Sequence, residues 1–353
     1  MCEVRPSIKF GTDGWRGVIS DDFTFENVRL VAQAIADYYN ASRTPGAGIK
    51  LAVGFDTRFL SDQYAQAVSG VLAKNGIDVL LSDRCVPTPT LSYCVKNRGL
   101  DAGVMITASH NPGSYNGIKI KTAAGGAAGV EITREVEKLV VDPAPQKNYP
   151  AGRIAEADMT LEYVDFLRRY IDFKKLRGFK FNVLVDAMHG SGDSFLGQVL
   201  AGTKVNVEFL RADINPSFEG GRPEPVLENL KPTAAKMRTG RFDLAIVLDG
   251  DADRIAAFAG KAEFINPQKI LGLLILHLIQ DRGMSGGVVK TLVCSNLIDN
   301  ICHAMKLKLY ETPVGFKYIS ELLVSQDILV GGEEAGGMGF KNYIPERDGS
   351  LAG

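Results

Sequence analysis

The sequence has 353 residues, of which 45% are hydrophobic and 23% are charged, and its formal net charge is −1. This is the composition of a soluble globular protein of two or three domains, and it shows no basic excess that would favour nucleic acid. The longest apolar stretch, residues 270–279, is too short to span a bilayer. We therefore expect no nucleic-acid partner and no membrane span.

The cysteines and the N-terminus predict a cytoplasmic protein. Five cysteines, an odd number without a Cys-x-x-Cys pair, are interpreted as reduced thiols rather than as a disulfide framework. The first residues lack the apolar core of a signal peptide. The sequence does not distinguish a monomer from a dimer.

Helices and strands alternate in the first part of the chain, which indicates an α/β fold. Apolar residues recur with helical spacing over residues 24–39, and an apolar strand is predicted at 51–55. A second helix is expected to start at Ser61, which is interpreted as its N-cap, and a strand at 79–81 follows. Arg58, between these elements, either orients the neighbouring loops or forms a surface ion pair.

A predicted strand at 104–106 leads into the segment Thr107-Ala108-Ser109-His110-Asn111-Pro112-Gly113. Asn-Pro and Pro-Gly form turns, so Ser109 is expected at the exit of the strand with its hydroxyl free. Lys119 lies ten residues further on, within an alternating pattern that predicts another strand. The Gly-x-Ser-x-Gly motif of lipase-type enzymes is absent, so the residues alone leave open a nucleophilic serine or an ordinary turn.

A linker rich in Pro, Ala and Gly is expected at about 141–152, before a helix at 160–171. The strand predicted at 181–185 then ends in a glycine-rich connection. That connection departs from the dinucleotide-binding fingerprint, because Phe195 stands at the third glycine position. We interpret it as a tight strand-to-helix turn.

Three carboxylates, Asp249, Asp251 and Asp253, follow an apolar run at 244–248 that predicts a buried strand. Carboxylates at such close spacing repel one another unless a cation lies among them, and Mg²⁺ prefers oxygen ligands. A calcium-binding EF-hand is excluded, because Arg254 stands where that loop needs glycine. A solvated acidic turn without metal is the alternative.

The last part of the chain predicts a third α/β unit. Its expected elements are a helix at 267–280, a strand at 288–293, a helix at about 296–305 and a strand at 328–330. The final strand leads into the glycine-rich segment Gly-Glu-Glu-Ala-Gly-Gly at 332–337.

The sequence resembles the α-D-phosphohexomutases, the family of phosphoglucomutase and phosphomannomutase. Residues 107–112 resemble its phosphoserine loop, 249–254 its magnesium loop and 332–337 its sugar-recognition loop. Residues 11–17, Gly-Thr-Asp-Gly-Trp-Arg-Gly, resemble the opening segment that places an arginine in the site. The four motifs occur in the family's order and cover the chain from end to end.

This resemblance implies three consecutive related α/β domains with mixed sheets and an active-site cleft between them. We expect the phosphoserine loop in a domain at 1–150, the metal loop in 151–257 and the sugar loop in 258–353. The family continues past Arg347-Asp348-Gly349 with a fourth, smaller domain. Because the sequence given ends at Gly353, that domain is expected to be absent.

The resemblance also implies a mechanism. A phosphorylated Ser109 would exchange its phosphate with a hexose monophosphate, through glucose 1,6-bisphosphate as intermediate and activator, and Mg²⁺ would be bound by Ser109 and the three aspartates. The implied catalytic residues are Ser109, with His110 and Lys119 for proton transfer and Arg16 and Arg254 for charge stabilisation. A surface lysine and a loop-bracing histidine are the alternatives for Lys119 and His110.

The sugar is expected to contact the 332–337 segment and neighbouring loops. The implied substrate-binding residues are Gly332, Glu333, Glu334, Ala335, Lys290, Gly315 and Lys317. Ala335 replaces the family's usual serine, so one hydroxyl contact is lost. By the resemblance, Phe316 and the pair Glu333-Glu334 favour glucose as the sugar of the substrate. The alternatives are a phosphomannomutase, a phosphoglucosamine mutase, a sugar-phosphate phosphatase, and a fragment with little or no turnover.

Overall fold

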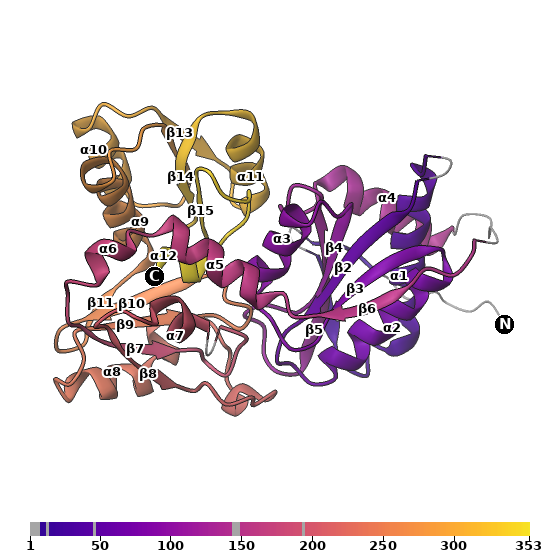
Figure 1. The fold of residues 1–353 in the computed structure, drawn as a ribbon, viewed down its shortest axis with the longest axis horizontal. Coiled ribbons are helices and arrows are strands. Elements are labelled where there is room, and N and C mark those ends of the chain that lie inside the picture. Colours follow the sequence, from indigo (N-terminus) through magenta and orange to yellow (C-terminus); the bar gives the residue numbers. More distant parts are fainter. Residues whose placement is uncertain (1–7, 12–13, 45–46, 143–148, 193–194) are drawn as a thin grey trace.

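The computed structural model describes residues 8–11, 14–44, 47–142, 149–192 and 195–353. It consists of three α/β units, each built around its own sheet (Figure 1). The first unit occupies one end of the molecule. The second and third lie together at the other end, with Gly353 between them (Figure 1). This confirms the expectation of three consecutive α/β domains with mixed sheets.

The first sheet has six strands in the order β1-β5-β4-β2-β3-β6. Its strands are β1 (Trp15–Val18), β2 (Ile49–Phe55), β3 (Ile77–Ser82), β4 (Ala102–Ile106), β5 (Tyr115–Thr122) and β6 (Ile154–Ala157). β2, β3, β4 and β6 are parallel, whereas β5 is antiparallel to both β4 and β1. The parallel strands therefore present their carboxyl ends, where ligands bind in such sheets, at one edge.

Helices cover both faces of this sheet. The helices are α1 (Phe25–Ala41), α2 (Ser61–Lys74), α3 (Thr88–Asn97) and α4 (Val130–Val141). Leu51 and Val53 pack in the core cluster formed with α1, α2 and α4, whereas Ala52 packs in the cluster formed with α3. Alternate residues of a strand point to opposite faces, so β2, in which Lys50 is the one charged and exposed residue, is buried on both sides along the rest of its length.

Ser61 is not the N-cap of α2, as the sequence had suggested. Leu60 occupies the N-cap position in a left-handed conformation and makes no side-chain cap. The Ser61 hydroxyl instead donates to Asp56 Oδ1 at 2.9 Å. A buried carboxylate at the end of β2 thus engages the hydroxyl that would otherwise cap the helix.

The second sheet has the order β11-β10-β9-β7-β8. The elements of this unit are α5 (Thr160–Tyr170), α6 (Phe173–Leu176), β7 (Asn182–Asp186), α7 (Phe195–Leu200), β8 (Asn206–Leu210), η1 (Phe218–Gly220), η2 (Leu227–Asn229), α8 (Lys231–Arg238), β9 (Leu244–Leu248), β10 (Ile255–Ala259) and β11 (Glu263–Ile265). β7, β8 and β9 are parallel to one another. β10 pairs antiparallel with β9, and β11 pairs antiparallel with β10. The three predicted aspartates occupy the turn between β9 and β10.

The third sheet has the order β13-β12-β14-β15, with only β15 antiparallel. The elements are α9 (Pro267–Leu276), the π-helical turn η3 (His277–Asp281), β12 (Gly287–Thr291), α10 (Asn296–Ala304), β13 (Leu309–Thr312), α11 (Phe316–Ser325), β14 (Ile328–Gly332), β15 (Met338–Phe340) and α12 (Gly349–Ala352). The predicted strand at 288–293 is shorter than expected, because Leu292 and Val293 lie beyond the strand and are exposed.

The sheets extend past the domain boundaries expected at residues 150 and 257. β6 pairs with β3, so the first sheet runs to residue 157, and the second sheet runs to Ile265 in β11. The expected linker at 141–152 includes residues 143–148, which lie outside the described residues. No helix of the described residues is long and apolar enough to cross a membrane.

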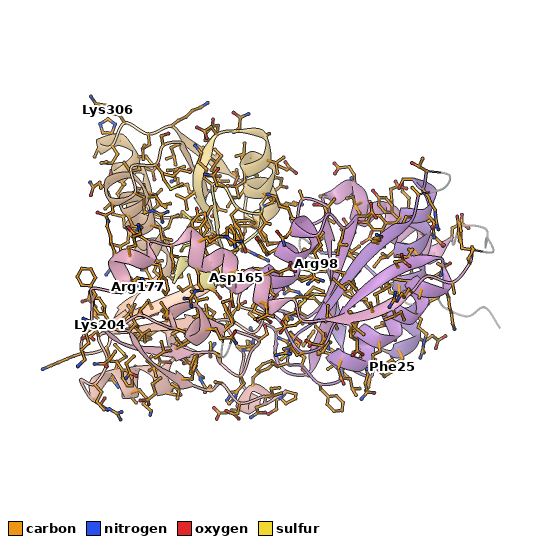
Figure 2. All side chains as sticks on the ribbon, viewed as in Figure 1. Phe25, Arg98, Asp165, Arg177, Lys204 and Lys306 are labelled. Atoms are coloured by element: carbon orange, nitrogen blue, oxygen red, sulfur yellow. The ribbon has the colours of Figure 1, made fainter. Side chains whose placement is uncertain are left out.

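α5 connects the first unit to the other two. Arg98, labelled in Figure 2 where the first unit meets the others, donates to Glu162 of α5 at 2.8 Å. An aromatic cluster joins α3, α5 and the third unit, and contains Tyr93, Tyr163, Phe166 and Tyr343. At its centre Asp348 Oδ2 accepts hydrogen bonds from the Tyr163 and Tyr343 hydroxyls at 2.8 and 2.7 Å.

A fully buried ion pair also links the first and third units. Lys121 Nζ of β5 lies 2.5 Å from Glu346 Oε2, and both side chains are at most 1% exposed. Glu346 Oε1 accepts from the Arg347 amide at 3.0 Å. Since Glu346 precedes the residues that reach the candidate site, this pair fixes the third unit against the sheet that carries the serine loop.

Replacing Lys121 by Met should destabilise the protein, because Glu346 would remain buried without its cation. Breaking a buried pair from one side costs about 3–5 kcal/mol, whereas removing both charges is nearly neutral. We expect a lower midpoint of thermal unfolding for Lys121→Met, with most of the loss recovered in Lys121→Met/Glu346→Gln. A single variant as stable as the native protein would contradict this.

A second prediction concerns Asp348, whose Oδ1 caps α12 by accepting from the Leu351 amide at 2.8 Å. Burial raises the pKa of Asp348 to about 6 despite hydrogen bonds from Leu351, Tyr343 and Tyr163. The folded state therefore holds this proton more tightly than the unfolded chain. The resulting stability is present below about pH 4 and is lost as the pH rises through about 6.

The comparison is between the native protein and Asp348→Asn, by calorimetry from pH 7.5 to pH 5. As the pH falls from 7.5 to 5, we expect the unfolding free energy of the native protein to rise by about 1 kcal/mol relative to that of Asp348→Asn. A difference that does not vary with pH would refute the assignment.

Candidate functional site

The predicted serine loop follows β4 at the carboxyl edge of the first sheet. We call residues 107–115 the nucleophile loop. Ser109 has a positive φ of 53°, and its amide donates to Thr107 Oγ1 at 2.8 Å. A left-handed conformation is unfavourable for serine, so the surrounding contacts must impose it. Its hydroxyl donates to Asp249 Oδ2 at 3.1 Å and lies 3.3 Å from His110 Nδ1.

Asp249, Asp251 and Asp253 form a cluster in which one oxygen atom of each lies within 4.8 Å of the others, and all three residues are fully buried. Lys119 Nζ of β5 lies 2.8 Å from Asp251 and 3.1 Å from Asp253. Arg347 Nη2, from the third unit, donates to Asp253 Oδ2 at 2.6 Å. The turn thus carries three carboxylates that the first and third units help to neutralise.

Burial sets the electrostatics of this cluster. It raises the pKa of Asp249 well above the usual range, and the charges of Asp253 and Asp251 raise it further. For Asp251 burial acts the same way, but the charge and hydrogen bond of Lys119 and the hydrogen bond of Thr88 outweigh it and lower the pKa. The cluster therefore still favours additional positive charge beside Asp249.

The cluster fits a hard divalent cation. Asp251 Oδ1 and Asp253 Oδ1 are buried, and neither accepts a hydrogen bond from any residue that the structure describes. Buried carboxylate oxygens without partners are costly, and oxygen atoms in this number and spacing are the ligands that Mg²⁺ prefers. The three aspartates, with Ser109 Oγ beside Asp249, are the residues that would hold it.

His110 is held neutral beside the serine. Burial, followed by the charges of Arg254 and Arg16, lowers the pKa of His110 to about 2. The neutral imidazole can accept a hydrogen bond at one ring nitrogen, but with so low a pKa it binds a proton only weakly. The neighbouring Arg16 is fixed by donating from Nη1 to Asn111 Oδ1 at 2.8 Å.

Two glycines permit the close approach of the three motifs. A Cβ at Gly250 would lie 2.4 Å from the Ser109 carbonyl oxygen, so the metal loop and the nucleophile loop touch through their backbones. Gly336 has a φ of 100°, and a Cβ there would lie 2.5 Å from the Ile255 carbonyl oxygen. The Ile255 amide also donates to the Gly336 carbonyl at 3.1 Å. The metal loop is therefore packed directly between the serine and sugar loops.

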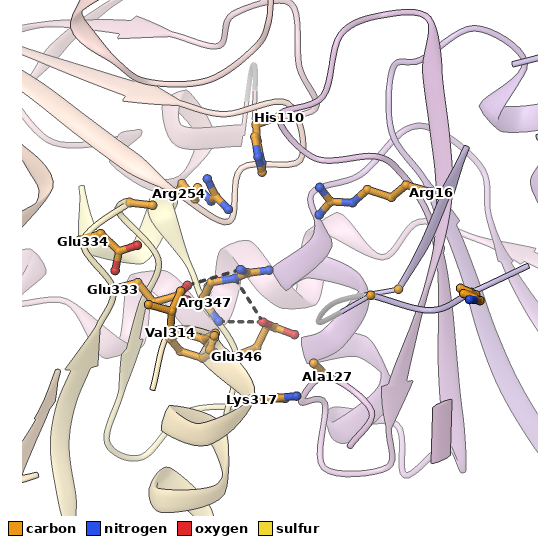
Figure 3. A pocket seen from close by; sticks show the side chains of 16 residues that line it. Arg16, His110, Ala127, Arg254, Val314, Lys317, Glu333, Glu334, Glu346 and Arg347 are labelled. Carbon is orange, nitrogen blue, oxygen red and sulfur yellow. Dashed lines mark hydrogen bonds and ion pairs between the residues drawn. The ribbon is translucent and has the colours of Figure 1, made fainter. Parts of the chain in front are cut away.

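The three motifs surround a cavity of about 420 Å³. Figure 3 shows Arg16, His110 and Arg254 converging on it, with Glu333 and Arg347 on the side of the third unit. The residues that line it are Lys9, Gly11, Gly14, Arg16, His110, Ala127, Arg254, Val314, Gly315, Phe316, Lys317, Glu333, Glu334, Ala335, Glu346 and Arg347. Cationic side chains beside three glutamates suit a ligand that carries both phosphate and hydroxyl groups.

Most of the predicted substrate-binding residues line this cavity, but Lys290 and Gly332 do not. The Lys290 ammonium is paired with Asp299 at 2.5 Å and Glu311 at 3.3 Å. Gly332 is buried at the end of β14, where its Cβ position would meet Leu271. Lys290 therefore lies in an ion-pair cluster of the third unit rather than in the cavity.

Sequence reasoning missed Arg347 and undervalued Arg58. Arg347 bridges Asp253 and, at 3.4 Å, Glu333. Burial raises the pKa of Glu333, with the Arg347 charge opposing it. Arg58 forms no surface ion pair, because its side chain is fully buried and contacts the nucleophile loop. The signal for Arg58 was its place after β2, at the same carboxyl edge as Ser109. For Arg347 the sequence offered no comparable signal.

Comparison with known proteins agrees with this geometry. The models of "Phosphoglucomutase/phosphomannomutase, alpha/beta/alpha domain I", domain II and domain III match residues 7–146, 161–262 and 266–353. A probable phosphoglucosamine mutase of Methanopyrus kandleri is 32% identical over 328 residues, which cover 93% of this chain and 70% of that protein. A phosphoglucomutase of Komagataeibacter xylinus is 29% identical, over 98% of this chain and 68% of its own length.

Among solved structures, a Thermus thermophilus protein described as a phosphomannomutase superposes with a TM-score of 0.91. It is 37% identical, and the match covers 98% of this chain and 78% of that one. The relatives thus carry three different substrate names on one fold. This chain belongs to the α-D-phosphohexomutase family of phosphotransferring isomerases.

Proposed function

We propose that this chain is an Mg²⁺-dependent phosphohexomutase. It would interconvert a hexose 1-phosphate and a hexose 6-phosphate through phosphorylated Ser109 and a hexose 1,6-bisphosphate, with glucose as the preferred sugar. The observation that carries the proposal is the hydrogen bond of 3.1 Å between Ser109 Oγ and Asp249 of the acidic cluster. It brings a hydroxyl nucleophile and an acidic cluster that fits a cation together beside a cavity of about 420 Å³.

In the first half-reaction a sugar hydroxyl attacks the phosphorus of phospho-Ser109. A bond forms between the sugar oxygen and phosphorus while the bond from phosphorus to Ser109 Oγ breaks. The sugar hydroxyl loses its proton to a base, and Ser109 Oγ gains one. The reverse sequence on the other phosphate of the bisphosphate restores phospho-Ser109, so the net change is an isomerised sugar.

The protein's task in such a transfer is positioning and charge neutralisation. Arg16 and Arg254 would pair with the anionic oxygens of the transferred phosphoryl group, since both side chains line the cavity. Bound at the aspartates, Mg²⁺ would supply Lewis-acid neutralisation of phosphoryl oxygens. His110 and Lys119 are the residues proposed for proton transfer around Ser109 Oγ. Lys119 would donate a proton, whereas His110, a weak base at its lowered pKa, would accept a hydrogen bond from the hydroxyl 3.3 Å away.

Glu333 and Glu334 are proposed to bind the sugar hydroxyls, because carboxylates accept hydrogen bonds from adjacent hydroxyls. Thr291 Oγ1 fixes Glu334 by donating to its Oε2 at 2.7 Å. Gly315, Lys317 and Ala335 complete this side of the cavity. Phosphomannomutase and phosphoglucosamine mutase activities are the alternatives, and the relatives' names favour none of the three sugars.

The proposal is tested by the intact mass of the protein after incubation with glucose 1,6-bisphosphate and Mg²⁺. We expect one added phosphate on the native chain and none on Ser109→Ala. Mutase rates on the 1-phosphates of glucose, mannose and glucosamine would then rank the sugars, with glucose expected first. Equal phosphorylation of Ser109→Ala would sink the serine assignment, and inorganic phosphate without isomerised sugar would indicate a phosphatase instead.

A further inference from the structure

We propose that Arg58 is a positioning residue for the Ser109 nucleophile, acting through the backbone of the nucleophile loop rather than by touching the substrate. The inference rests on the proposed function, and it adds to the site a residue outside the cavity lining. It starts from the number and direction of the hydrogen bonds that the Arg58 side chain makes.

All five N–H groups of the Arg58 guanidinium are used. Four of them donate to backbone carbonyls of the nucleophile loop. These are Nη2 to Ser109 O at 2.6 Å and Asn111 O at 2.7 Å, and Nη1 to Pro112 O at 2.7 Å and Tyr115 O at 3.0 Å. The fifth, Nε, donates to Asp56 Oδ2 at 3.1 Å. The planar guanidinium of Arg58 thus binds carbonyl oxygens along the loop from Ser109 to Tyr115.

This arrangement is specific to a guanidinium. Four carbonyl oxygens that converge on one point repel one another unless donors separate them. Only arginine offers five N–H donors in a fixed plane, whereas a lysine ammonium has three and no planar fork. Because the peptide group is planar and trans, turning the Ser109 carbonyl toward Arg58 also turns the His110 amide away from it. Arg58 therefore sets the orientation of the peptide that follows the nucleophile.

The guanidinium is itself anchored from several sides. Asp56 Oδ1 accepts from the Arg58 amide at 3.0 Å and from Ser61 at 2.9 Å, while Asp56 Oδ2 accepts from Thr107 Oγ1 at 2.6 Å. The Phe218 ring of the second unit lies 4.9 Å from the Arg58 guanidinium carbon. The anchor thus connects the end of β2, the start of the nucleophile loop and the second unit.

The consequence falls on Ser109. Its carbonyl is held between Arg58 Nη2 and the backbone of Gly250, and its φ of 53° is unfavourable without such constraints. Since the hydroxyl must stay beside Asp249, a small rotation of this peptide would move the nucleophile away from the acidic cluster. Misplacement by about 1 Å can cost about a hundredfold in rate.

The kinetic test compares Arg58→Lys with Arg84→Lys, a matched change of an arginine whose side chain is 59% exposed. For Arg58→Lys we expect kcat to fall at least about fiftyfold and KM to change less than about threefold. Arg84→Lys should resemble the native protein. A rise in KM at unchanged kcat, or a threefold or smaller loss of kcat, would overturn the inference.

Chemical rescue separates positioning from a general loss of structure. Arg58 lines an open groove of about 620 Å³, and Arg58→Gly would leave the volume of the buried side chain free beside it. Millimolar guanidinium chloride should raise kcat of Arg58→Gly at least about tenfold and leave Ser109→Ala unchanged. No rescue in a variant whose thermal unfolding matches that of Arg58→Lys would count against positioning.

A third measurement needs no substrate, so it remains decisive if the proposed mutase activity is absent. In Arg58→Lys, hydrogen exchange of peptides from residues 107–116 should accelerate at least about tenfold, with peptides from 182–186 unchanged. If Arg58→Lys does not fold, Asp56→Asn, which keeps the guanidinium and removes its anchor charge, should show the same local acceleration. Native exchange rates in the loop of a folded variant would refute the role of Arg58.

Discussion

Three carboxylates buried in one turn are the constraint on which the rest of this structure depends. Asp249, Asp251 and Asp253 are taken out of water within 4.8 Å of one another, and such a group is unstable unless cations are brought to it. Lys119 reaches the cluster from the first unit and Arg347 from the third. Compensating the charge of this turn therefore requires all three units to meet at it.

The meeting of the units in turn explains the backbone around the site. Loops that converge on one turn must approach closely, and they do so where no side chain intervenes, at Gly250 against Ser109 and at Gly336 against Ile255. The same crowding accounts for a serine with a positive φ, held by carbonyl contacts to Arg58. Strain at the nucleophile is thus maintained by packing and hydrogen bonds of neighbours that take no part in the chemistry.

The sequence predicted the elements whose signals are local. Apolar runs located the strands before Ser109 and Asp249. The spacing of the aspartates predicted a cation-binding turn, and buried carboxylate oxygens that accept no hydrogen bond from the described residues support it. The resemblance to the α-D-phosphohexomutases predicted the three units. What the sequence could not supply were contacts between residues distant along the chain. Arg347 bridges Asp253 and Glu333 only because the sugar loop folds back over the metal loop.

The errors have the same origin. Serine is a residue type that often caps helices, but in the folded state the Ser61 hydroxyl donates to Asp56, which lies earlier in the chain. For Arg58 the sequence left open a role in orienting loops or a surface ion pair, and the second alternative is wrong. The side chain is buried because the nucleophile loop, much later in the chain, turns its carbonyls toward it. Lys290, expected near the sugar, does not line the cavity, and its ammonium pairs with Asp299 and Glu311. In each case a tertiary partner decided the outcome.

The central claim is that Ser109 and the three aspartates form one cation-dependent site. Crystals soaked in Mn²⁺, which can replace Mg²⁺ and scatters anomalously, test it most directly. We expect an anomalous peak within bonding distance of Asp249, Asp251 and Asp253, adjacent to Ser109 Oγ, and no such peak in crystals of Asp251→Asn/Asp253→Asn. Manganese bound elsewhere, or a native cluster that stays empty at millimolar Mn²⁺ while Lys119 keeps its ion pairs, would contradict the account.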